Sequence, residues 1–328
     1  MSSTTSAIVS AGYAYPSERV DNATYLARCR FPIGDGAELA RETRMHTRTW
    51  CTDEENTWTM ARAAARMALE GAGAAAADID LVIVASGTTM PIAHPAQREQ
   101  PGMADLAPLV IRELGLRALG FDVKACYCTG FLRGLELADA LLAAGRHRAA
   151  LVIASEQGSR FAVAESNRST FCFIMSDAAG AVVLRRSERA PGVGIVAHTG
   201  YTAADKLDWV GIGPDAASTV MMGTRAAGAT HEMLVECARG LLAQAPARPR
   251  WLLPIQTHAR VVEGLQRALE WPDAGLLWTG DVTGFAGSAS IPACFAEQRA
   301  AGTIRPGELV LAVAVGAGMN CAGALFHA

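Results

Sequence analysis

Short apolar segments alternate with longer amphipathic segments along most of this chain. The alternation is clear at 57–71, an alanine-rich stretch with helical spacing, which is followed by the apolar run DLVIVAS at 80–86. Short apolar runs between helices are typical of strands that are buried on both faces. The pattern therefore predicts an α/β fold in which a mainly parallel sheet is covered by helices on both faces.

The same unit recurs toward the C-terminus. Further strands are predicted at 120–125, 149–155, 193–198, 250–255 and 308–315, and further helices at 106–116, 130–144, 225–245, 259–270 and 287–301. The charged segment RRSERAPG at 185–192 separates two stretches with the same order of elements. We therefore expect two pseudo-duplicated halves, an N-terminal one at 1–186 and a C-terminal one at 187–328.

One segment is apolar enough to resemble a membrane span. Residues 309–326 read LVLAVAVGAGMNCAGALF, about the length that crosses a bilayer. The Gly-Ala-Gly at 316–318 and the polar Asn320 instead favour two buried strands joined at a tight bend. The first twenty residues have no basic start and no continuous apolar stretch, so we expect a cytoplasmic protein without a signal peptide or membrane anchor.

Charge and cysteine spacing exclude other classes. The chain has 29 Lys plus Arg and 32 Asp plus Glu, a net charge of -3, so no nucleic-acid or membrane-surface partner is expected. The eight cysteines form no CxxC pair and no Cys/His metal spacing. Most are therefore predicted to be small core residues in a reducing compartment, and neither a metal nor a bound cofactor is expected.

Residues 121–156 form the one segment whose pattern indicates chemistry. The segment reads strand, cysteine-bearing turn, amphipathic helix, strand. A cysteine at the start of a helix faces unpaired backbone N–H groups and the positive end of the helix dipole, which favour the thiolate. Cys126 and Cys128 are therefore candidate nucleophiles, although inert packing is the commoner role of a cysteine in an apolar chain.

Several sequence blocks occur in an order that is shared with a known enzyme family. They include CTGF at 128–131, NRSTFCFIMSDAAGAVVL at 167–184, WLLPIQTHARVV at 251–262, GFAGSASIP at 284–292 and VGAGM at 315–319. With these blocks the chain resembles the 3-oxoacyl-[acyl-carrier-protein] synthase III family of thiolase-like condensing enzymes. The resemblance implies a five-layered α-β-α-β-α thiolase fold, a homodimer, and a cysteine that takes an acyl group from an acyl-CoA or acyl-carrier-protein thioester.

The resemblance also assigns catalytic residues. The family's nucleophile precedes an x-G-F element, which selects Cys128, while counting from the preceding strand keeps Cys126 as the alternative. The final glycine turn implies that the backbone N–H of Gly318, together with that of Cys128, forms the oxyanion hole.

Two other catalytic positions of the family carry different residues in this chain. Ile255 stands where the family has a histidine, and Phe285 stands where it has an asparagine. In the family this pair donates hydrogen bonds that hold the enolate formed when a malonyl group loses CO₂. Neither Ile nor Phe has a donor, so ordinary decarboxylative chain extension is not expected.

Further residues are expected to shape the substrate site. His258 either acts as a base or occupies the family's asparagine position and shapes the pocket. Arg260 matches an arginine that lines the coenzyme A mouth, and Met222 is expected to line the acyl pocket. Another family arginine falls on Glu42 by strict count. A basic and aromatic cluster is expected in the region that holds the adenine in the family: Arg41, Arg44, Arg48 and Trp50.

The sequence therefore predicts an acyltransferase that loads Cys128 and passes the acyl group to an amine, hydroxyl or activated carbon rather than to malonyl, as expected in specialised metabolism. One alternative retains C–C condensation with His258 as the base. Another is a non-catalytic partner subunit of a related synthase, which the loss of two catalytic positions favours and the intact CTGF turn opposes.

Overall fold

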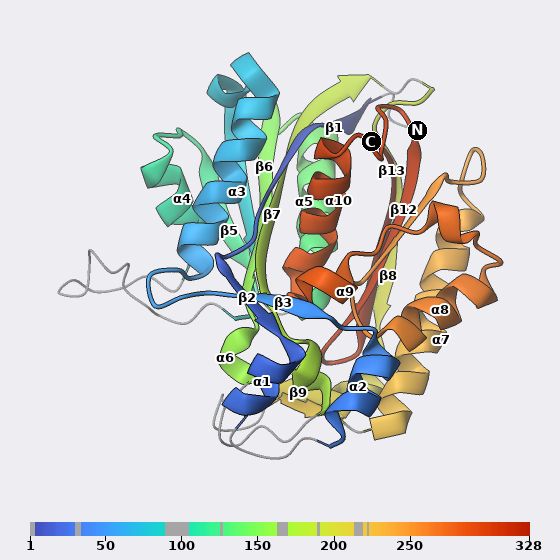
Figure 1. The fold of residues 1–328 in the computed structure, drawn as a ribbon. Coiled ribbons are helices and arrows are strands. Elements are labelled where there is room, and N and C mark those ends of the chain that lie inside the picture. Colours follow the sequence, from blue (N-terminus) through green and yellow to red (C-terminus); the bar gives the residue numbers. More distant parts are fainter. Residues whose placement is uncertain are drawn as a thin grey trace.

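Two mixed β-sheets and the helices around them make up the molecule (Figure 1). The computed structural model describes residues 4–29, 34–88, 105–124, 127–162, 170–188, 191–212, 219–221 and 223–328. Two short antiparallel pairs lie outside the large sheets: β2 (Glu18–Asp21) with β3 (Thr47–Trp50), and β9 (Val210–Ile212) with β10 (Thr219–Met221).

The first large sheet has the order β1-β7-β6-β4-β5. Its strands are β1 (Thr4–Ala14), β4 (Ile79–Ala85), β5 (Leu119–Val123), β6 (Ala149–Gln157) and β7 (Asp177–Glu188). Strand β4 runs parallel to β5 and β6, whereas β7 runs antiparallel to β6 and β1. The predicted strands at 80–86, 120–125 and 149–155 are confirmed.

The second large sheet has the order β11-β12-β13-β8. Its strands are β8 (Ile195–Thr202), β11 (Trp251–Pro254), β12 (Leu309–Gly316) and β13 (Asn320–His327). Strands β11 and β12 are parallel, and β13 is antiparallel to both of its neighbours. In both sheets an antiparallel strand, β7 or β13, lies next to the parallel strands. The first strand of the segment, β1 or β8, then pairs with that antiparallel strand.

The expectation of a mainly parallel sheet is wrong, because β7 and β13 each run antiparallel to two neighbours. Helices cover both faces of both sheets (Figure 1), and burial on both faces makes a strand apolar throughout whichever way it runs. An apolar run therefore reports burial and leaves the strand direction open.

The apolar segment at 309–326 forms two strands, as predicted. Strands β12 and β13 pair antiparallel from Leu309 with His327 to Gly316 with Asn320. Both strands are buried along almost their whole length. Among the described residues, no helix combines the length and the apolar character that a bilayer crossing requires.

The helices form three layers around the two sheets (Figure 1). Helices α3 (Thr57–Ala72) and α4 (Ala107–Glu113) cover the outer face of the first sheet, and α7 (Gly223–Leu242) and α8 (Ala259–Ala268) that of the second. Helices α5 (Gly130–Ala143) and α10 (Ser290–Ala300) lie between the sheets. This arrangement confirms the predicted five-layered α-β-α-β-α fold.

Shorter helices connect the layers. They are α1 (Asn22–Arg28), α2 (Gly36–Thr43), α6 (Ser159–Ala162) and α9 (Gly280–Thr283), and the 3-10 helices η1 (Gly73–Asp78), η3 (Tyr127–Thr129), η4 (Thr170–Ile174), η5 (Ala204–Trp209), η6 (Asp273–Gly275) and η7 (Gly287–Ala289).

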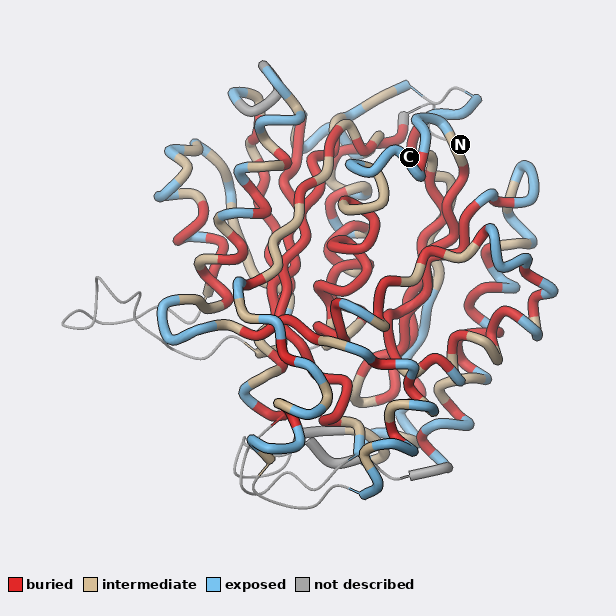
Figure 2. The backbone as a smooth tube through the Cα atoms, in the orientation of Figure 1, coloured by how far each residue is buried: buried red, intermediate tan, exposed pale blue. Residues whose placement is uncertain are grey.

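Small residues allow the layers to approach closely. Ala61, Ala64, Ala65 and Ala68 of α3 have no exposed surface, and a Cβ on Gly12 of β1 would lie 2.3 Å from the carbonyl oxygen of Ala64. The central layer and the facing strands are the most deeply buried parts of the chain (Figure 2). The alanine-rich helix at 57–71 is therefore explained by close packing against a strand.

Candidate active site

Cys128 lies in η3, directly before the central helix α5. It borders a cavity of about 440 Å³. The start of α5 is pressed against the end of β4, because a Cβ on Gly130 would lie 3.1 Å from the Cβ of Ala85. Tyr127 adopts a left-handed φ of 41°, a conformation that costs a bulky residue about 1–3 kcal/mol and is often found at functional sites. The cysteine is therefore held by packing on both sides.

Asn320 joins the cysteine turn to the hairpin between β12 and β13. Its Oδ1 accepts a hydrogen bond from the Thr129 hydroxyl, and its Nδ2 donates to the carbonyl of Ala317 at 2.8 Å. Asn320 is 7% exposed, so no bulk water replaces these partners. The side chain therefore fixes the position of Ala317 relative to Cys128.

The donor beside the sulfur is Ala317 rather than Gly318. The backbone N–H groups of Ala317 and Cys128 act on the Cys128 sulfur, whereas the N–H of Gly318 donates to the carbonyl of Val210 at 3.0 Å. The structure thus differs from the prediction at Gly318, whose N–H is already engaged. The positive φ of 70° at Gly318 completes the bend.

The surroundings of Cys128 oppose the thiolate that the start of the helix favours. Burial, and secondly the negative charge of Glu156, raise the pKa of Cys128 to about 12. The N–H groups of Cys128 and Ala317 favour the thiolate but are outweighed. The helix-end effect inferred from the sequence is smaller than the cost of removing the charged sulfur from water.

Glu156, at the end of β6, is the buried carboxylate next to this thiol. It is 2% exposed and accepts hydrogen bonds from the N–H of Gly87, from the N–H and hydroxyl of Thr88, and from the hydroxyl of Ser288 at 2.5 Å. Burial raises the pKa of Glu156, and these donors oppose the shift. Glu156 thus connects the ends of β4 and β6 to η7 beneath the cavity.

The walls of the cavity are mainly apolar. Ile255 and Phe285 both line it and are 4% and 2% exposed. Backbone hydrogen bonds fix both positions, from Ile255 to Val313 and from Phe285 to Ile174, each at 2.8 Å. Two residues that the resemblance places at catalytic positions therefore do border the Cys128 cavity, and their side chains offer it no hydrogen-bond donor.

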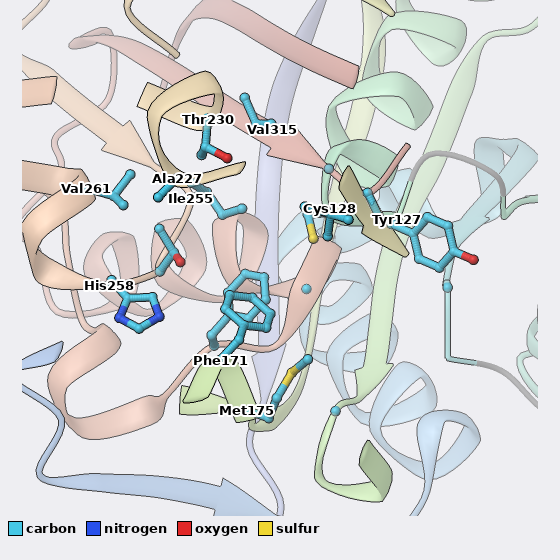
Figure 3. Close-up of a pocket in the computed structure, with 18 of the residues that line it drawn as sticks. Tyr127, Cys128, Phe171, Met175, Ala227, Thr230, Ile255, His258, Val261 and Val315 are labelled. Atoms are coloured by element: carbon cyan, nitrogen blue, oxygen red, sulfur yellow. The ribbon is translucent and has the colours of Figure 1, made fainter. Parts of the chain in front are cut away.

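His258 borders the same cavity but stands apart from the sulfur. Figure 3 shows His258 at the left and Cys128 just right of the middle, with Ile255 and Phe171 between them. The ring of Phe171 lies 6.0 Å from that of His258 and 5.3 Å from that of Phe285, centre to centre. Burial lowers the pKa of His258, which favours a neutral imidazole at pH 7. Both roles predicted for His258, base and pocket-shaping residue, therefore stay predictions.

The predicted basic and aromatic cluster does not form one surface. Arg48 has no exposed surface, and its guanidinium donates to the carbonyls of Val20 and Asp21 and to Oδ1 of Asn22. The buried indole of Trp50 donates to the carbonyl of Met175. These two residues belong to the core, so the expectation of an adenine site that includes them is wrong.

Other predicted residues lie at the cavity mouth or outside the described part of the chain. Arg260 lines the mouth and pairs with Glu42 at 2.9 Å. Arg41 is exposed, and Arg44 forms an ion pair with Glu263 at 2.7 Å. Cys126, the alternative nucleophile, and Met222 lie outside the described residues.

The sequence reasoning missed Glu156, Ala317 and Asn320. Glu156 had a detectable signal, because it is the acidic end of the apolar run AALVIASE, and the carboxyl ends of parallel strands meet at one edge of a sheet. Asn320 and Ala317 had no such signal, since their roles depend on a hairpin that is remote from Cys128 in the sequence.

We expect Asn320→Leu to slow acyl loading of Cys128 by about 10²-fold, because a catalytic donor that is displaced by about 1 Å loses roughly that factor. The change also removes the acceptor that Asn320 offers to the Thr129 hydroxyl and the donor that it offers to the Ala317 carbonyl. The rate is measured from the intact mass of the protein after mixing with an acyl donor. Gln244→Leu, which removes an exposed donor to Gly240, should leave the rate unchanged, and equal rates for all three proteins would contradict this role of Asn320.

Comparison with protein families identifies both halves of the site. The model for 3-oxoacyl-[acyl-carrier-protein (ACP)] synthase III matches residues 121–203, and the model for its C-terminal region matches residues 245–328. The first range contains Cys128 and Glu156, and the second contains Ile255, Phe285 and Ala317.

Relatives and solved structures agree with these models. The chain is 34% identical to a beta-ketoacyl-[acyl-carrier-protein] synthase III of Rhodospirillum rubrum over 98% of both chains. The crystal structure of 3-oxoacyl-(acyl carrier protein) synthase III from Pseudomonas aeruginosa shares the fold, with a TM-score of 0.86 at 24% identity over 98% of both chains. A priming beta-ketosynthase of the R1128 polyketide pathway superposes with a TM-score of 0.85 at 25% identity, over 98% of this chain and 95% of that one. The chain therefore belongs to the 3-oxoacyl-[acyl-carrier-protein] synthase III family of thiolase-like enzymes.

Proposed function

We propose that this protein is an acyltransferase that loads an acyl group from an acyl-CoA or acyl-carrier-protein thioester onto Cys128 and passes it to an acceptor other than malonyl. The observation that carries the proposal is the composition of one cavity. It joins the Cys128 sulfur and its backbone N–H donors to Ile255 and Phe285, which offer no donor for an enolate.

The loading step forms one bond and breaks another. The Cys128 sulfur attacks the thioester carbonyl, and the oxygen that becomes negative accepts hydrogen bonds from the N–H groups of Cys128 and Ala317. Collapse of this intermediate breaks the bond to the donor's sulfur, which leaves as a thiol carrying the proton that Cys128 loses. An amine, hydroxyl or activated carbon then displaces Cys128 and takes the acyl group.

The cavity supports an acyl chain as its occupant. About 440 Å³ is within the usual range for small-ligand sites. Its walls include Phe171, Met175, Val261 and Val315 (Figure 3). Apolar walls with few polar groups suit a hydrocarbon tail whose reactive carbonyl lies at the sulfur.

A second candidate function is C–C condensation, which the names of the relatives favour: two are beta-ketoacyl-[acyl-carrier-protein] synthases III and one is a priming beta-ketosynthase. In this candidate His258 would serve as the base. Its place across the cavity from Cys128 in Figure 3 favours the acyltransferase instead.

We further propose that the protein is a cytoplasmic homodimer. Strand β5 lies at an edge of the first sheet, and Leu119 in it is 57% exposed. Among the described strands β5 has a neighbour on one side only, and such an edge with an exposed leucine suits pairing with a second copy. The intact CTGF turn and the cavity beside Cys128 favour a catalytic chain over a non-catalytic partner subunit.

Intact-mass measurement with a panel of acyl-CoA and acyl-pantetheine thioesters tests the proposal. The unchanged protein should gain the mass of one acyl group, and Cys128→Ala should gain none. Cys126→Ala is the matched control and should still be acylated. Acylation of Cys128→Ala, or no adduct on the unchanged protein with any donor, would refute loading at Cys128.

A further inference from the structure

The mouth of the cavity carries a carboxylate that neutralises its arginine. Glu42, in the last turn of α2, and Arg260, in the first turn of α8, both line the cavity. Their Oε1 and Nη1 atoms are 2.9 Å apart, and the side chains are 31% and 71% exposed. The carboxylate is thus the more enclosed partner, and the arginine extends from it toward solvent.

A second ion pair holds the same two elements together. Arg44, which follows α2 with a left-handed φ of 55°, contacts Glu263 of α8 at 2.7 Å. Glu263 also lies 3.9 Å from Arg267 one turn further along α8. The segment after α2 therefore lies against α8 beside the Glu42–Arg260 pair, and this second pair touches neither of those two residues.

The charge of Glu42 acts on a residue inside the cavity, His258, as well as on Arg260 at the mouth. Glu42 acts to raise the pKa of His258, and Arg260 acts to lower it, although burial is the main influence. Both charges therefore act on a residue that lines the same cavity. A ligand that enters by this mouth meets a carboxylate and an arginine whose charges cancel.

We infer that Glu42 is a specificity-determining residue that disfavours free coenzyme A thioesters and favours donors with fewer phosphates at the mouth. The inference rests on the proposed function, in which Cys128 takes an acyl group from a thioester. The phosphates of coenzyme A form a polyanion, so Glu42 repels them and offsets the attraction that they would otherwise feel toward Arg260. Such a rim charge acts mainly on encounter and on the salt dependence of binding.

The test compares two donors that carry the same acyl group, acyl-CoA and acyl-pantetheine, of which the second has no phosphate. We expect Glu42→Gln to raise the ratio of their kcat/KM values for loading, acyl-CoA over acyl-pantetheine, by about 5-fold at low salt. The gain should disappear in about 1 M salt, where the Debye length is about 3 Å. A change in the reactivity of Cys128 would alter both kcat/KM values equally, so it cancels in their ratio.

Two further variants locate the effect. Glu263→Gln frees Arg44 on the same two elements without changing a residue that lines the cavity, and it should leave the ratio within about 2-fold. Adding Arg260→Ala to Glu42→Gln should abolish the gain. An unchanged ratio in Glu42→Gln, or equal changes for both donors, would overturn the inference.

A binding measurement separates this inference from the proposed function. Calorimetric titration with coenzyme A needs no acylation, and Glu42→Gln should bind it about 5-fold more tightly than the unchanged protein. If that occurs but neither donor acylates Cys128, the proposed loading fails while the effect of Glu42 stands. If both donors acylate Cys128 and Glu42→Gln changes neither the ratio nor the affinity, only the inference about Glu42 fails.

Discussion

Iodoacetamide should alkylate Cys128 about 10³-fold more slowly than an ordinary thiol at about pH 8, because only the thiolate reacts. A pKa of about 12 leaves roughly 10⁻⁴ of the thiol ionised at that pH, against roughly 10⁻¹ for an unperturbed cysteine. The rate should rise about tenfold per pH unit with no plateau below about pH 10. Peptide mass spectrometry measures it, with fragment ions distinguishing Cys128 from Cys126 and with Cys29, which is half-buried, as the internal comparison.

The variant Glu156→Gln measures how much of the slow alkylation of Cys128 is caused by the charge of Glu156. Removing the negative charge removes one of the two influences that raise the pKa of Cys128, so alkylation at a fixed pH should become faster. Glu263→Gln, a change of the same type in α8 outside the cavity lining, should not alter it. A plateau near pH 7 in the unchanged protein would show a resting thiolate and contradict both expectations.

Malonyl thioesters should lose CO₂ on this protein at least about 10³-fold more slowly than on an enzyme that has hydrogen-bond donors at the positions of Ile255 and Phe285. Decarboxylation leaves an enolate whose oxygen needs hydrogen-bond donors, and each donor of this type contributes about 10²–10³ in rate. Ile255 and Phe285 occupy the cavity wall with no donor to offer. Release of labelled CO₂ from malonyl-pantetheine and malonyl-CoA measures the rate without depending on the choice of carrier.

A double variant, Ile255→His with Phe285→Asn, tests whether the missing hydrogen-bond donors cause the slow loss of CO₂. The two new donors should raise the release of CO₂, provided that Cys128 still accepts an acyl group in the loading assay. The single variant Val261→Ala, another change in the cavity wall, should not raise it. Rapid release by the unchanged protein would favour C–C condensation and refute the non-malonyl proposal.

The sequence predicted the elements better than their arrangement. The alternation of apolar runs and helices located α3, α5, β4, β6 and the β12–β13 hairpin, because burial of an element dictates its own residues. It did not predict that β7 and β13 run antiparallel, since a strand covered on both faces has the same composition in either direction.

Some residues of the candidate site could be predicted from motifs, and others could not. Motif resemblance identified Cys128, Ile255 and Phe285, and the structure places all three on one cavity. It assigned the second backbone donor to Gly318, one residue beyond Ala317, because only the hydrogen bond of Gly318 to Val210 reveals which N–H is free. Arg48 was expected at the surface, but its cation lies over the rings of Tyr25 and Phe173 in the core.

The sequence by itself determined which segments form helices and strands, because periodicity lies in neighbouring residues, and its motifs made Cys128 the first candidate nucleophile by resemblance to a family. Only the tertiary structure decided what surrounds that thiol, since Glu156, Ala317 and the apolar walls come from segments that are far apart in the chain. Desolvation and charge act through space, so their balance at Cys128 exists only once those segments have packed together.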